Sequence, residues 1–216
     1  MIENMNSTND KAPEEAMKLG AVISSDWQSY TWKNELAEQK DRISQHLQEI
    51  LSEADTEHNP HHMIERAIGV AALCMRRLLE CRLVTDSFRN SKLEVHCVPR
   101  NADNQWRESF ISRTASEIFQ NYDLTLRKSD KQSPKWISDK LLHARVISVV
   151  RGSSYLPDGL LVASDQQRKR HLFHFSPTEF SELLNEFLND VVKSTSDSFE
   201  IIDGEIHTDK VIATRD

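Results

Sequence analysis

The chain has 216 residues, of which 28% are charged, with a net charge of −7 and a mean hydropathy of −0.58. A chain of this length buries about 70% of the surface that its unfolded form exposes, so a core without disulfides or structural metals suffices. No stretch reaches the roughly 18 apolar residues of a membrane helix, and five glycines are too few for a glycine-rich sandwich or a nucleotide-cradling loop protein.

In chain order, residues 1–24 are polar and without pattern, and we expect them to be disordered. A long amphipathic helix is predicted from Ser25, whose side chain can cap the first turn. A second, more apolar helix is predicted after Pro60. Residues 25–86 therefore predict a long antiparallel helical hairpin as the core of the fold.

Residues 87–192 predict a mixed part made of further helices and a small antiparallel sheet. Leu93, Val95 and Cys97 alternate with polar residues, as in a half-exposed strand. The other expected elements are a strand in 108–114, a short helix in 115–124, a helix over 133–150, paired strands at 159–164 and 171–176, and a helix over 176–192. We therefore expect an α+β fold with one domain over 25–192.

Residues 193–216 form an acidic tail in which Asp203-Gly204 could turn a small hairpin. The acidity belongs to a wider pattern: residues 1–60 hold 5 Lys and Arg against 12 Asp and Glu, and residues 176–216 hold 3 against 10. The remaining 19 basic and 12 acidic residues give 61–175 a charge of +7. This basic middle could face nucleic acid, or the acidic ends of its own chain or of a second copy, and we favour neutralisation by acidic ends.

The stretch Arg89-Asn-Ser-Lys-Leu-Glu-Val-His96 places an arginine, an adjacent polar residue and a histidine in one short window. It resembles the Arg-polar-spacer-His signature of HEPN-type ribonucleases. That resemblance implies a metal-independent endoribonuclease in which Arg89 and His96 share a helix face. The alternation after Lys92 instead predicts a strand, along which seven residues separate the two side chains by about 23 Å.

His143 is a second candidate, because the helix expected over 133–150 places it at the edge of the apolar face. A histidine there is more often a partly buried structural side chain than a general base. If that helix packs on the central helix, His143 could approach Arg76, Arg77 or Arg82.

Two further clusters have simple interpretations. Arg168, Lys169 and Arg170 form a basic loop beside Phe173 and Phe175, which could seat single-stranded nucleic acid but is also typical of a charged hairpin loop. His58, His61 and His62 lie in an expected turn without the carboxylate or cysteine spacing of a zinc site. We therefore predict no metal and no cofactor.

The three cysteines, Cys74, Cys81 and Cys97, fit no zinc motif and favour a reducing compartment. The N-terminus lacks the pattern of a signal peptide, so we expect a cytoplasmic protein. The sequence favours a non-catalytic binding or accessory protein that self-associates or docks to a protein partner, with no membrane association. A HEPN-like endoribonuclease and a nucleic-acid-binding protein are the alternatives.

Overall fold

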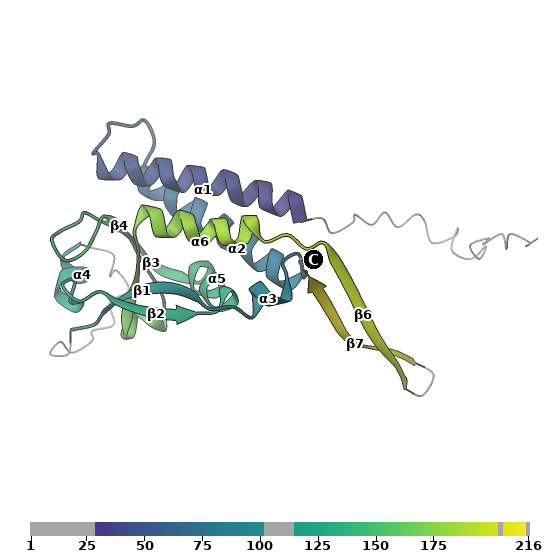
Figure 1. Ribbon diagram of the computed structural model, residues 1–216. Coiled ribbons are helices and arrows are strands. Elements are labelled where there is room, and N and C mark those ends of the chain that lie inside the picture. The colour runs from purple at the N-terminus through teal and green to yellow at the C-terminus, as the bar shows by residue number, and fades with distance from the viewer. Residues whose placement is uncertain (1–28, 102–114, 203–204, 215–216) are drawn as a thin grey trace, which may run out of the picture.

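The fold is α+β, as the sequence predicts, in a computed structural model that describes residues 29–101, 115–202 and 205–214 (Figure 1). The expected disordered segment 1–24 and the strand expected in 108–114 lie outside these residues. The helices are α1 (Ser29–Leu51), α2 (Pro60–Glu80), α3 (Asp86–Arg89), α4 (Ala115–Asn121), α5 (Pro134–Leu142) and α6 (Pro177–Asn189). The strands are β1 (Leu93–Pro99), β2 (Lys128–Gln132), β3 (Ala144–Val150), β4 (Gly159–Ser164), β5 (His171–Phe175), β6 (Ser194–Ile202) and β7 (Glu205–Thr214).

Helices α1 and α2 pack along each other through apolar stripes that the sequence pattern predicts. Leu36 and Leu47 of α1 and Ile68 of α2 are buried in one cluster. The Asn59 side chain caps α2, and Pro60 occupies its first turn, where a missing N–H costs nothing. The same cluster also contains side chains of α3, α5, α6, β1, β4 and β5, so the two helices share their core with the sheet.

The main sheet has five strands in the order β2-β1-β5-β4-β3, and every neighbouring pair is antiparallel. Side chains alternate between its two faces. One face, which includes Val95, Val162 and Phe173, packs on α1, α2, α5 and α6. The other face contributes Val98 and Leu161 to a second buried cluster with α4. The edge strands are β2 and β3.

The prediction of a helix over 133–150 is wrong for its second half. Helix α5 ends at Leu142, with His143 as its C-cap, and Ala144–Val150 form β3. Its start is confirmed, because the Ser133 hydroxyl accepts a hydrogen bond from the N–H of Trp136. The run Val-Ile-Ser-Val-Val consists largely of β-branched residues, which pack better on a pleated surface than in a helix.

The C-terminal elements extend well away from the rest of the molecule. Strands β6 and β7 pair only with each other, from Ser194 opposite Thr214 to Ile202 opposite Glu205. This two-stranded ribbon is longer than the small hairpin that the sequence predicts, and residues 203–204 lie outside the described part. In Figure 1 it projects beside α3, at the opposite end of the molecule from α4.

Within the described residues, no helix has the length and apolar character needed to cross a membrane.

Candidate functional site

The residues of the HEPN-like stretch lie on different elements. Arg89 is the last residue of α3, a four-residue helix that the sequence did not predict, and its guanidinium pairs with Asp86 at 3.2 Å. His96 lies in the middle of β1, so the backbone from Leu93 onward is extended, as the alternation predicts. Arg89 and His96 are therefore not brought together on one helix face.

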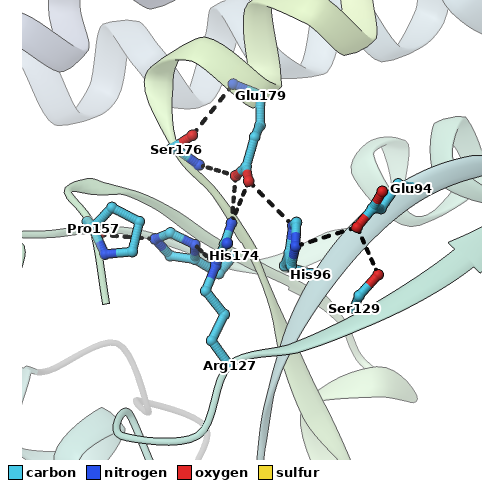
Figure 2. A network of polar contacts seen from close by, with 8 residues as sticks. All are labelled: Glu94, His96, Arg127, Ser129, Pro157, His174, Ser176 and Glu179. Carbon is cyan, nitrogen blue, oxygen red and sulfur yellow. Dashed lines mark hydrogen bonds and ion pairs between the residues drawn. The ribbon is translucent and has the colours of Figure 1, made fainter. Parts of the chain in front are cut away.

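His96 instead lies beside a polar network that connects β1, β5, α6 and the segment before β2 (Figure 2). We call His96, Arg127, His174 and Glu179 the His–Arg–Glu cluster. His96 is directly opposite His174 in the register of β1 and β5. Arg127 lies between the ring of His174 and the carboxylate of Glu179.

His174 is fully buried, and both of its ring nitrogens have partners. Its Nδ1 accepts a hydrogen bond from Arg127 Nε at 2.9 Å. Because an arginine nitrogen only donates, the ring proton is on Nε2, which donates to the carbonyl of Pro157 at 3.0 Å. Burial first, and the positive charge of Arg127 second, lower the pKa of His174 to about 4. This histidine is therefore neutral at physiological pH.

Glu179 is the acceptor at the centre of the cluster. It forms the capping box of α6 with Ser176, and Arg127 Nη2 donates to its carboxylate oxygens at 2.6 and 2.5 Å. Burial alone would raise the pKa of Glu179, but hydrogen bonds from Arg127 and Ser176 outweigh it and hold the pKa below its ordinary value. The carboxylate is therefore ionised and fixed in place.

His96 lies between two carboxylates. Its Nδ1 is 3.2 Å from Glu179 Oε1, and its Nε2 is 3.6 Å from Glu94 Oε1. Glu94, on the surface, also accepts a hydrogen bond from the Ser129 hydroxyl on β2. The contacts of the cluster link β1, β5, α6 and the segment before β2, so its geometry fits a cross-brace between these elements.

Of the three arginines that the helical prediction offered to His143, Arg76 pairs instead with Asp139, one turn before His143, and with Glu80 on its own helix. His143 is exposed after the end of α5, where it lines a surface cavity with Lys140.

In the basic loop two side chains are exposed and the third forms an ion pair. Lys169 and Arg170 are exposed, whereas Arg168 pairs with Asp165 at 2.7 Å. The neighbouring aromatics Phe173 and Phe175 are buried in the helical core, so their faces are not offered to a base. The loop keeps its positive charge but not the stacking platform that the sequence suggested.

His61 and His62 lie in the first turn of α2, where Asn59 caps the helix. The backbone N–H groups of His61 and His62 donate to the side chain of Asn59. Across the part of the chain that the structure describes, no group of His, Cys, Asp and Glu side chains is arranged to hold a metal ion.

The outer edge of β3 borders two cavities of the described surface. A cavity of about 620 Å³ has α2 and the side chains of Ile147 and Val149 on one face of the sheet. On the other face it has α4 and Leu161. A second cavity of about 680 Å³ lies at the start of β3, and Glu65 lines both. We call the two together the edge groove.

The edge groove contains an unsatisfied polar atom. Ser164 lines its second cavity and is buried, and its hydroxyl has no hydrogen-bond partner among the described residues. An unpaired buried hydroxyl costs free energy, which a partner with a hydrogen-bonding backbone would recover.

Sequence reasoning missed Arg127 entirely, and it recognised Glu179 only as a helix-capping residue. The capping box was a usable signal for the position of Glu179, but nothing in the local sequence predicts that Arg127 reaches both Glu179 and His174.

No protein-family model, curated protein or solved structure matched this chain. Its function therefore has to be inferred from its own residues.

Proposed function

We propose that the protein is a non-catalytic binding protein that captures an extended segment of a protein partner along β3. The observation that carries this proposal is the edge groove, which offers one open backbone edge between walls from both faces of the sheet. Extended peptides bind such edges through main-chain hydrogen bonds, and adjacent pockets select their side chains.

The two edges of the sheet differ in the way that this proposal requires. Edge strand β2 carries exposed Lys128 and Lys131, and charged side chains of this kind discourage further strand pairing. In β3 the one charged residue, exposed Arg145, lies near the start of the strand, and the half-buried positions Ile147, Ser148 and Val149 carry no charge. An uncharged stretch with open space beside it favours the addition of a strand.

The remaining features fit a passive scaffold. The α1–α2 pair supports one face of the sheet as a rigid helical hairpin, and the cross-braced His–Arg–Glu cluster fixes the centre of the sheet. We place the protein in the cytoplasm, because its three cysteines are free and Cys74 is buried, where burial raises the pKa of the thiol to about 11.

The proposal is tested by selecting peptides from a displayed library on the purified protein and measuring their affinity by fluorescence anisotropy. We expect enriched peptides to be extended and to slow hydrogen exchange at the β3 amides. Ser148→Lys should weaken them at least about tenfold, which is about 1.4 kcal/mol, because a lysine fills the groove.

The matched control is Ser129→Lys, the same substitution on the opposite edge strand β2, which should bind the peptides as the wild type does. Selection that enriches no peptide, or peptides that bind Ser148→Lys unchanged, would refute strand capture at β3.

A further inference from the structure

We infer that the edge groove receives the β6–β7 ribbon of a second copy of this chain, an inference that rests on the proposed function. The protein would then be a dimer in which each ribbon extends the sheet of the other chain at β3.

The ribbon is incomplete as an isolated structure. Strands β6 and β7 pair with no other strand in the described part of the chain. A two-stranded hairpin is at best marginally stable in water, and three or more strands with a buried face are needed for stability. Addition to the open edge of a five-stranded sheet would supply what the ribbon lacks.

The composition of the ribbon matches the groove. Between Ser194 and Thr214 the sequence has five acidic residues and one lysine, together with an apolar set at Phe199, Ile201, Ile202, Ile206, Val211 and Ile212. A strand of this composition offers apolar residues to a groove lined by Ile147, Val149 and Leu161, and acidic residues to the basic residues that border it.

The second cavity of the edge groove carries two basic side chains. Lys140 and Arg145 line it together with Glu65 and Asp165, and Asp165 is paired with Arg168. Arg151, at the first cavity, is paired with Glu53. Arg145 is exposed and forms no ion pair among the described residues, so its charge is open to a partner. Opposite charges of this kind bring two protein surfaces together faster and fix their register.

The ribbon cannot reach the groove of its own chain. Figure 1 shows the ribbon beside α3 at one end of the molecule, whereas α4, which forms a wall of the groove, lies at the other end. A second copy places a ribbon at the groove, and reciprocal docking closes the assembly with twofold symmetry.

Sedimentation velocity of the full chain over a range of concentrations tests this inference. We expect a dimer for the wild type. Arg145→Glu on the groove and Glu200→Lys on the ribbon should each raise the dimer dissociation constant at least about tenfold, because each brings like charges together. An equal mixture of these two variants should recover association, since the reversed charges then face each other across one of the two docking sites.

Lys131→Glu on edge strand β2 is the matched control and should sediment as the wild type does. Circular dichroism establishes that each variant is folded. Slower hydrogen exchange at the amides of Val146–Val150 in the dimer is a second expected result that requires no substitution.

A wild-type chain that remains a monomer at every concentration would overturn the inference, as would a dimer that both variants leave unchanged. A dimer weakened by Glu200→Lys but not by Arg145→Glu would also overturn it, because the ribbon would then dock elsewhere. The peptide selection, repeated on Glu200→Lys, in which the ribbon no longer occupies the groove, decides the proposed function separately.

Discussion

Replacing His174 should remove a large part of the acid sensitivity of the fold between neutral pH and pH 5. Burial also lowers the pKa of His171, so that histidine retains a contribution of the same sign. The folded pKa of His174 is lowered to about 4, whereas that of the unfolded chain is near the ordinary value of 6.5. Between these values the unfolded state binds a proton that the folded state does not, so the free energy of unfolding falls as the pH falls. The contribution is complete above pH 6.5 and declines toward pH 4.

The size of the effect follows from the two pKa values. Going from pH 7.5 to pH 5, a group with these values removes about 2 kcal/mol from the free energy of unfolding. The groups that face His174 are Arg127, Glu179 and His96. Glu179 has a lowered pKa, so its contribution is lost only below its ordinary value of 4.5, outside this window.

Urea unfolding followed by tryptophan fluorescence at the two pH values measures the difference. His174→Gln keeps an acceptor and a donor for Arg127 and Pro157 but does not titrate, so it should lose about 2 kcal/mol less than the wild type over this range. His96→Gln removes the partly exposed ring on the neighbouring strand and serves as the control. An acid sensitivity as large in His174→Gln as in the wild type would refute a neutral, buried His174.

Three further predictions concern the same sheet. Arg127→Met should lower the free energy of unfolding by about 3 kcal/mol, because it leaves the half-buried Glu179 carboxylate and the His174 ring nitrogen without their donor. Urea titration measures this loss, and a loss below about 1 kcal/mol would contradict the bracing role. Gly159→Ala should lower the free energy of unfolding by more than about 2 kcal/mol, because the added carbon would lie 2.2 Å from the Phe175 carbonyl oxygen. The control Gly69→Ala adds a carbon with no atom within 4 Å and should be neutral or stabilising. Equal melting temperatures for the two variants would contradict this expectation. Labelled RNA incubated with the protein and EDTA should stay intact, and cleavage that disappears in His96→Ala would favour the ribonuclease alternative.

The elements that the sequence predicted correctly are those whose signals are local. Ser133 and Ser176 each cap a helix through a hydrogen bond three residues away, and a proline follows each of them. The strands around the basic loop are separated by six residues, so their pairing follows from chain proximity. In all these cases the interacting atoms lie within one turn or one hairpin.

The sequence failed where the outcome depends on distant partners. Residues 144–150 continue the apolar spacing of α5, but β4 supplies a strand for them to pair with, and the tertiary contact outweighs the helical pattern. The His–Arg–Glu cluster depends on the register of β1 and β5, which are joined through more than 70 intervening residues. No periodicity in the sequence reports that His96 lies opposite His174.

The polar network and the edge groove divide the sheet into a fixed part and an open part. Strands β1 and β5 are paired on both sides, and Arg127 and Glu179 tie them to α6. Strand β3 is paired on one side, and Arg151, the residue after its end, contacts Leu51 and Glu53 at the C-terminal end of α1. Regions with fewer such restraints open at lower free energy, and binding elements come from that end of the range. In the proposed capture of a strand, this fixed centre would let β3 adjust without disturbing the rest of the sheet.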